Sequence, residues 1–197
     1  MAAQILKPPK APADHGLMSD HDFTFLQKYR PQEERWHPID AVPFTMTPAT
    51  NVHQRPCINL VNLLLDAVEI ARPELVALNE RGLLIPGVER FRPIADVAVV
   101  VNDHGGSYTD CFFLAAEVRL RPNAEEYIPL KCERSMQHPD NLHVLVISQD
   151  ERRVEHWARS RDWARIELTA LTDTVDLPEF DCRFTLPQLY KGAPLAQ

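Results

Sequence analysis

This chain of 197 residues has few glycines and few cysteines, and it has no excess of positive charge. With six glycines and an ordinary share of apolar and charged residues, the chain is not collagen-like, coiled-coil or wholly disordered. Lys and Arg number 21 against 28 Asp and Glu, which gives a net charge of −7. Such an acidic protein is not a generic nucleic-acid coat. Any contact with phosphate requires a local basic patch or a bound cation.

The cysteines do not suggest disulfides or zinc. They are Cys57, Cys111, Cys132 and Cys182. No two of them form a C-x-x-C pair, and none has zinc-type spacing to histidine, so we expect reduced thiols that mainly fill the core.

Long apolar runs are also absent. The N-terminal segment has no signal-peptide core, and the apolar stretch 94–101 is too short to span a bilayer. We therefore expect a cytoplasmic protein with no membrane segment. Early prolines and few apolar residues predict a disordered tail over residues 1–20. Residues 21–197 are then expected to form one domain with a substantial core.

The hydrophobic periodicity predicts an α/β fold with a mixed central sheet flanked by helices and a C-terminal antiparallel hairpin extension. Residues 46–71 have helical spacing, with Thr47 or Thr50 as the cap and Pro56 as a point of restart or kinking. Further helices are predicted within 22–29, 73–81 and 124–136. Extended segments are predicted over 36–46, 94–101, 111–120, 142–147, 153–158 and 163–168, the last two as a half-exposed hairpin.

Two carboxylates interrupt the most apolar predicted strands. Asp96 lies within IADVAVVV, and Glu117 ends the run FFLAA. A buried carboxylate is costly unless it is paired, hydrogen-bonded or bound to a metal, and two on neighbouring strands also repel each other. A Mg²⁺ ion between them relieves both problems, because it prefers hard oxygen ligands. Arg119 is expected on the same strand face as Glu117, and Lys131 follows on the next element.

These residue types in this order satisfy the requirements of metal-assisted phosphodiester hydrolysis. The spacing is not specific by itself. Asp96 and Glu117 could instead lie at strand ends in solvent, or pair with Arg92, Arg119 or Arg121.

Several segments, taken in order, resemble one known family. They are WHPIDAVPFTMTPATNVHQ at 36–54, ADVAVV at 95–100, FLAAEV at 113–118, Lys131 followed by LHVLVISQDERRVEHW, and the closing DLPEFDCRFTLPQLY. Over about residues 22–190 this order is similar to the Uma2 family of predicted endonucleases. That family resembles the restriction-type nucleases of the PD-(D/E)xK class.

The resemblance implies a restriction endonuclease-like sheet, a Mg²⁺ site with Mn²⁺ as the other candidate ion, and DNA as substrate. Asp96 and Glu117 match the acidic metal-binding positions, and Lys131 matches the family's catalytic Lys. Arg119 takes the slot where related nucleases carry Lys, and His53 matches the first residue of the family's H-Q pair. These last two would contact the substrate. A homodimer is a further expectation, since nucleases of this fold are often dimers.

The sequence departs from the family pattern at four positions. His37 replaces a Glu, Ala41 a Gly, Ala95 a Pro and Ser135 a Tyr. His37 and Ser135 leave open a catalytically degenerate binding or scaffold module on the same fold. A separate interpretation is a small acidic interaction protein whose Asp96 and Glu117 form ordinary ion pairs.

A basic segment with two tryptophans lies between residues 151 and 165. Its arginines are Arg152, Arg153, Arg159, Arg161 and Arg165. The composition resembles a phosphate-contacting surface with stacking aromatics, but it is more typical of a solvated hairpin face with the tryptophans packed inward.

Overall fold

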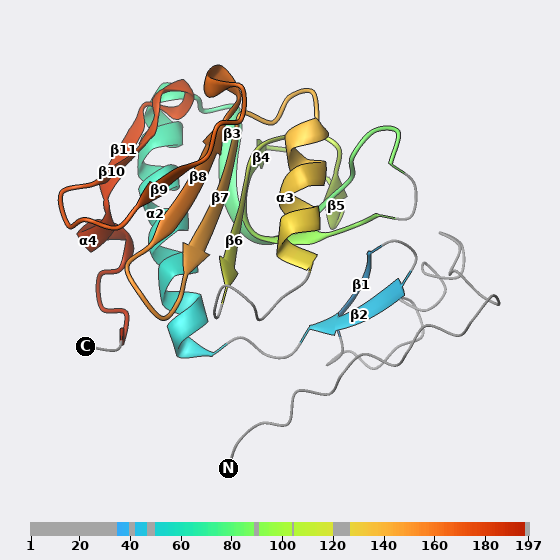
Figure 1. Ribbon diagram of the computed structural model, residues 1–197. Helices are drawn as coiled ribbons and strands as arrows, with labels where there is room; N and C mark the ends of the chain where they lie inside the picture. Colours follow the sequence, from blue (N-terminus) through green and yellow to red (C-terminus); the bar gives the residue numbers. More distant parts are fainter. Residues whose placement is uncertain are drawn as a thin grey trace, which may run out of the picture.

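The computed structural model describes residues 35–39, 42–46, 50–88, 91–103, 105–119 and 127–195, with side chains from residue 50 onward (Figure 1). The predicted tail over 1–20 and the predicted helix within 22–29 lie outside these residues. Strands β1 (Arg35–Ile39) and β2 (Val42–Met46) pair antiparallel. The expectation of an extended hairpin over 36–46 is confirmed.

Seven of the described strands form the central sheet. They are β3 (Leu75–Leu83), β4 (Ile94–Val101), β5 (Tyr108–Thr109), β6 (Phe112–Arg119), β7 (His143–Ser148), β8 (Val154–Ala158) and β9 (Ile166–Leu168). Their order across the sheet is β5-β3-β4-β6-β7-β8-β9. The β3–β5 and β6–β7 pairs are parallel and the others are antiparallel. The predicted mixed sheet is therefore confirmed, as is the hairpin of β8 and β9.

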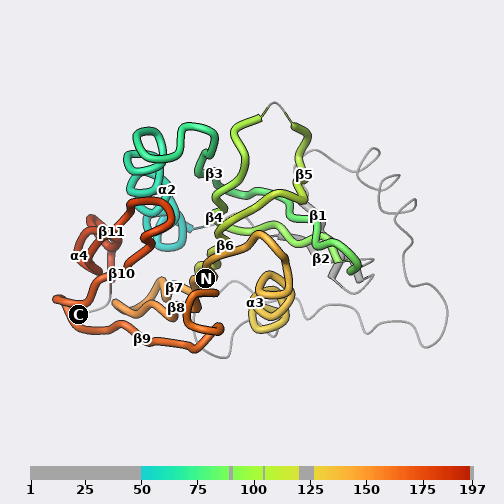
Figure 2. The backbone as a smooth tube through the Cα atoms, turned by 90° about the horizontal axis from the view of Figure 1, so that it is seen from above, coloured from blue at the N-terminus to red at the C-terminus, as the bar shows by residue number. Residues whose placement is uncertain are grey.

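Two helices cover opposite faces of this sheet (Figure 2). Helix α2 (Asn51–Ala71) begins after Thr50, whose side chain accepts a hydrogen bond from the backbone N–H of His53. Of the two predicted cap residues, Thr47 and Thr50, it is Thr50 that caps the helix. The helix continues through Pro56, so the expected restart does not occur there. Helix α3 (Tyr127–Gln137) joins β6 to β7, as parallel neighbouring strands require a crossover.

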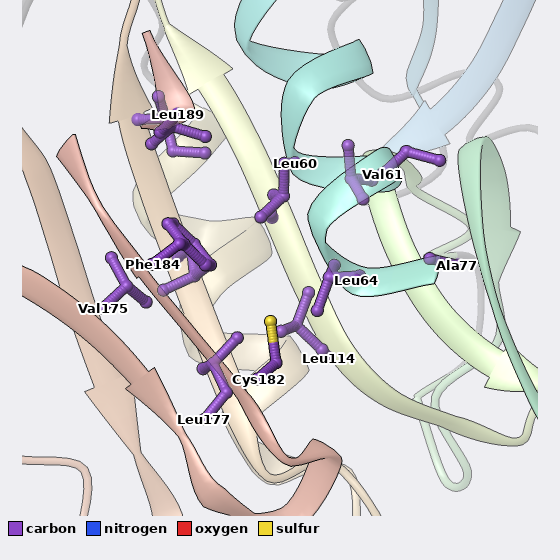
Figure 3. Close-up of a cluster of buried hydrophobic side chains, with 14 of the residues drawn as sticks. Leu60, Val61, Leu64, Ala77, Leu114, Val175, Leu177, Cys182, Phe184 and Leu189 are labelled. Carbon is purple, nitrogen blue, oxygen red and sulfur yellow. The ribbon is translucent and has the colours of Figure 1, made fainter. Parts of the chain in front are cut away.

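The main core lies between α2, the sheet and a C-terminal unit (Figure 3). This unit contains β10 (Thr174–Leu177), the 3₁₀ turn η2 (Pro178–Phe180), β11 (Cys182–Thr185) and α4 (Leu186–Leu189). Leu60 and Leu64 of α2 are fully buried there, one helical turn apart. The β10–β11 pair confirms a C-terminal antiparallel hairpin. Smaller clusters lie under α3 on the other face.

The prediction of a helix over residues 73–81 is wrong, because this segment belongs to strand β3. Helix-favouring residues such as Glu74, Leu75 and Ala77 suggested the helix. In the structure Leu75 and Ala77 are buried on one face, and the strand pairs with β4 along its length. Long-range pairing therefore outweighs local propensity here.

Cys57, Cys132 and Cys182 are buried and Cys111 is exposed, all four as free thiols. Among the described residues, no helix is both long and apolar enough to cross a membrane.

Candidate active site

Lys131 and Glu117 form a buried ion pair between α3 and β6. Nζ of Lys131 lies 2.5 Å from Oε2 of Glu117 and donates a second hydrogen bond to the backbone carbonyl of Ile94 at 2.8 Å. Each of the two side chains is 8% exposed. Because Ile94 begins β4, the ammonium group ties α3 to two neighbouring strands. The structure thus brings together two residues that the sequence could only place on successive elements.

Asp96 lies on β4 with its carboxylate facing β6 and the start of α2. Oδ2 accepts a hydrogen bond from the backbone N–H of Val118 at 2.7 Å and lies 3.3 Å from Nε2 of His53. Burial opposes ionisation of this carboxyl group. The hydrogen bond from His53, the charges of Lys131 and His53, and the Val118 N–H outweigh it and lower the pKa of Asp96. Asp96 is therefore ionised at neutral pH.

The strand register explains why the two acids are neighbours. Val97 of β4 is the partner of Ala116 in β6, and the next step along both strands reaches Asp96 and Glu117. Residues at such opposed positions are adjacent in an antiparallel pair. Asp96 and Glu117 therefore follow the last paired residues of the two neighbouring strands, and the charges of both carboxylates act on the Cys57 thiol.

The alternation of side chains along β4 changes at Asp96. Ala95 packs in the cluster beside α3, whereas Val97 packs in the core beside α2, although residues two apart on a strand normally share a face. On the neighbouring strand β3, Glu80 has a left-handed backbone conformation with φ of 51° at the corresponding position. This local irregularity accompanies the turning of Asp96 toward His53.

Cys57 also belongs to this site, and the sequence analysis missed it by treating every cysteine as core filler. Its Sγ lies 3.8 Å from Nδ1 of His53, one turn earlier on α2. Burial, followed by the negative charges of Asp96 and Glu117, raises the pKa of the Cys57 thiol far above its usual range. The thiol is therefore a protonated neighbour and not a nucleophile. The i, i+4 spacing of His53 and Cys57 was the available signal.

Arg119 is not paired with Glu117, although both lie on the same strand. It forms an ion pair with Glu155 of β8, a buried acid that the sequence analysis did not single out. Glu155 also accepts hydrogen bonds from Arg153 and Arg165. Arg159 is engaged by the backbone carbonyls of residues 138 and 141 and lies 5.2 Å from the Trp163 ring centroid. Much of the predicted basic surface is thus occupied by contacts within the fold.

The donor set at this site fits a hard divalent cation. Asp96 and Glu117 supply carboxylate oxygens; Asp96 accepts a hydrogen bond from the backbone N–H of Val118, and Glu117 accepts one from Lys131. In the part of the chain from residue 50 to 195 that the structure describes, no three His, Cys, Asp or Glu side chains are grouped to hold a metal by themselves. Mg²⁺ commonly binds through one or two carboxylates and otherwise through water or phosphate oxygens. Two carboxylates therefore satisfy its needs.

Two of the four departures from the family pattern can be placed. Ser135 is buried on α3, and its carbonyl accepts a hydrogen bond from the Asn141 side chain. Ala95 is buried under α3. The side chains of His37 and Ala41 lie outside the residues whose side chains the structure describes.

The sheet and its buried acidic pair define a nuclease-like α/β protein. The model of the Uma2 family, described as "Putative restriction endonuclease", matches residues 22–188. This chain belongs to the Uma2 family. It is also similar in fold to a crystal structure from Anabaena variabilis described as "a putative nuclease belonging to DUF820", with a TM-score of 0.70. The two are 14% identical, over 88% of this chain and 97% of the other. The comparison with curated proteins gives no match.

Proposed function

We propose that this protein is a metal-dependent endonuclease of the PD-(D/E)xK class that hydrolyses DNA phosphodiester bonds in the cytoplasm. The proposal rests on one observation: two buried carboxylates and one ammonium group lie in the same region of the structure. Asp96 and Glu117 come from neighbouring strands, and Nζ of Lys131 lies 2.5 Å from Glu117. Membership of a family described as restriction endonucleases supports DNA as the substrate.

Asp96 and Glu117 would hold Mg²⁺ or Mn²⁺, together with the backbone carbonyl of Val118. A divalent cation bound there lowers the pKa of its water and offsets the charge of the phosphate. His53 hydrogen-bonds Asp96 and therefore orients the carboxylate, in addition to any contact with the substrate. Its position in the first turn of α2 is 22% exposed, which leaves part of the ring open to a ligand.

Two cationic residues would act on the phosphate. Nζ of Lys131 donates hydrogen bonds to Glu117 and to the carbonyl of Ile94. It would stabilise negative charge developing on the phosphate and help to position the attacking water. A guanidinium group is a poor base, so Arg119 would only attract the phosphate electrostatically.

Cleavage of supercoiled plasmid DNA tests the proposal. The wild-type protein with Mg²⁺ or Mn²⁺ should nick or linearise the plasmid, and Asp96→Asn and Glu117→Gln should each abolish the reaction. Both substitutions keep the side-chain size and remove the charge that would bind the cation. Glu69→Gln, an exposed acid on α2, is the matched control and should cleave like the wild type.

A second measurement separates the nuclease from a binding module that has lost catalysis. A cation that binds the native state raises the melting temperature. Stabilisation by Mg²⁺ or Mn²⁺ without cleavage of any DNA would point to the scaffold module. If the wild type shows neither cleavage nor stabilisation by either cation, the proposal is wrong.

A further inference from the structure

A row of side chains crosses four strands on the α3 face of the sheet. Glu117 of β6 is the register partner of Val146 in β7, Val146 is the partner of Glu155 in β8, and Glu155 is the partner of Glu167 in β9. Register partners in a sheet carry their side chains on the same face. The candidate metal ligand Glu117 and the buried Glu155 therefore share one row, two strands apart.

The arginines lie alongside this row. Glu155 is 4% exposed and pairs with Arg119, with Arg165 at 3.0 Å and with Arg153 at 3.5 Å. These contacts offset the cost of burying its carboxylate. Arg153 and Arg165 have another acidic partner in Glu167, at 3.3 and 3.8 Å respectively. For Arg119, in contrast, the ion pair with Glu155 places the guanidinium toward β8 and not toward Glu117.

Helix α3 covers the part of the row that contains both acids. Burial raises the pKa of the Cys132 thiol on α3 to about 12, and the charges of Glu117, Lys131, Glu155 and Arg119 all act on the same thiol. The Lys131–Glu117 and Arg119–Glu155 ion pairs therefore both lie near this thiol of α3. Because charges interact strongly in a buried position, the acid with which each cationic side chain pairs affects the neighbouring charged groups.

Arg119 has a second acid within reach. It lies two residues after Glu117 on the same strand, and such residues share a face at a separation of roughly 7 Å between Cα atoms. An arginine side chain easily covers that distance. A guanidinium that turned to Glu117 would compete with Lys131 and with any cation for the same carboxylate oxygens.

We propose that Glu155 is a positioning residue that holds Arg119 away from Glu117, so that Arg119 does not compete with the metal for the Glu117 carboxylate. This inference rests on the proposed function, since it assigns Glu117 to cation binding. Glu155 itself contacts neither the metal nor the reacting atoms. Its effect passes through Arg119, so it should vanish when Arg119 is removed. A residue that only stabilised the fold would not show this dependence.

Titration of the DNA-free protein with MgCl₂ and MnCl₂ measures the effect, with the rise in melting temperature or the heat of binding as readout. In Glu155→Gln, Arg119 is released toward Glu117, and the cation concentration at half-saturation should rise roughly tenfold, within the usual range for coupled sites. Adding Arg119→Ala to that variant should restore the wild-type half-saturation, because the competing cation is gone. The matched control is Glu167→Gln, which removes an acid one strand further from Glu117 and should leave the half-saturation unchanged.

The outcomes separate the two proposals. If the wild type does not bind either cation, the proposed function fails and this inference fails with it. Wild-type binding that is unaltered in Glu155→Gln overturns the inference alone. So does weakened binding that Arg119→Ala does not restore, because Glu155 would then support the site only through folding. If Glu155→Gln does not fold, Glu155→Asp takes its place, because it keeps the charge but shortens the side chain by one methylene. The cation concentration at half-saturation should then rise by less than in Glu155→Gln, and Arg119→Ala should again restore it.

Discussion

The thiol of Cys57 lies 3.8 Å from Nδ1 of His53, while the other ring nitrogen of His53 faces Asp96 at 3.3 Å. The direction of the hydrogen bonds in the series Cys57–His53–Asp96 follows from the protonation states of the two end residues. Asp96 is ionised at neutral pH and can only accept, so Nε2 of His53 carries the hydrogen. In the neutral ring, Nδ1 then accepts from the protonated thiol. Asp96 therefore sets the tautomer of His53, and Cys57 is a matching partner for the other ring nitrogen.

Replacing His53 should impair cation binding without unfolding the protein. His53→Ala removes the hydrogen bond that holds Asp96, and the loss of such a supporting contact typically weakens metal affinity or activity by about 10- to 100-fold. Cys57→Ser, which keeps a hydrogen-bond donor next to Nδ1, should have a much smaller effect. Mg²⁺ titration and plasmid nicking measure both variants. A His53→Ala protein with the wild-type Mg²⁺ half-saturation would contradict the role given to His53.

Removing Lys131 should destabilise the fold as well as stop cleavage. In Lys131→Met, the Glu117 carboxylate remains in a buried position without its ammonium partner, which costs about 3–5 kcal/mol in comparable cases. The double variant Lys131→Met, Glu117→Gln should recover most of that loss, because no unpaired charge remains. Urea denaturation gives the free energies of unfolding. Equal stability of the single and double variants would show that the pair contributes little to the fold.

The sequence singled out the residues of the candidate site but not the contacts between them. Asp96 and Glu117 were chosen because charged residues in apolar strands are costly, and Lys131 because it matches the resemblance to the family. Their distances depend on the β4–β6 register and on the crossover helix, which are long-range features. The partner of Arg119 was unpredictable for the same reason, since Glu155 is 36 residues away along the chain.

Most strands were also predictable, because runs such as IADVAVVV are buried on both faces. The error at residues 73–81 has a different cause. The segment is rich in helix formers, and only its pairing with β4 makes it a strand. Two further features could not be predicted: the left-handed (αL) backbone conformation of Glu80 and the changed side-chain alternation at Asp96. In neither case does the residue type indicate the observed geometry.

The core between α2 and the C-terminal unit should be sensitive to truncation. Leu64 is fully buried there, so Leu64→Ala should lower the free energy of unfolding by about 2–5 kcal/mol through lost burial and a residual cavity. Ile70, on the same helix, is 86% exposed, and Ile70→Ala should change stability by no more than about 0.5 kcal/mol. Chemical denaturation of the two variants measures the contrast. Similar values for both would mean that α2 does not pack as described.

A second buried network links the sheet to the C-terminal unit. Nε2 of His143 lies 2.7 Å from the Glu179 carboxylate, and Nδ1 of His143 lies 3.0 Å from Nε2 of His156. His143 thus lies between Glu179 and His156 in one buried series of polar contacts. Burial lowers the pKa of His143 despite Glu179, and burial, followed by the charges of His143 and Arg161, lowers the pKa of His156 to about 3.

This network should make the fold sensitive to acid. An unfolded histidine titrates near pH 6.5, whereas native His156 stays neutral until about pH 3, so the unfolded state binds more protons between these values. The stabilising contribution of His156 is thus complete above pH 6.5 and is lost as the pH falls toward 3. The free energy of unfolding should depend on pH less steeply in His156→Asn than in the wild type, by up to about 1.4 kcal/mol per pH unit. Urea denaturation between pH 7 and 4 measures both slopes, with Ile70→Ala as the control for the wild-type slope. Parallel curves for His156→Asn and the wild type would show that His156 titrates in the native state as it does in the unfolded state.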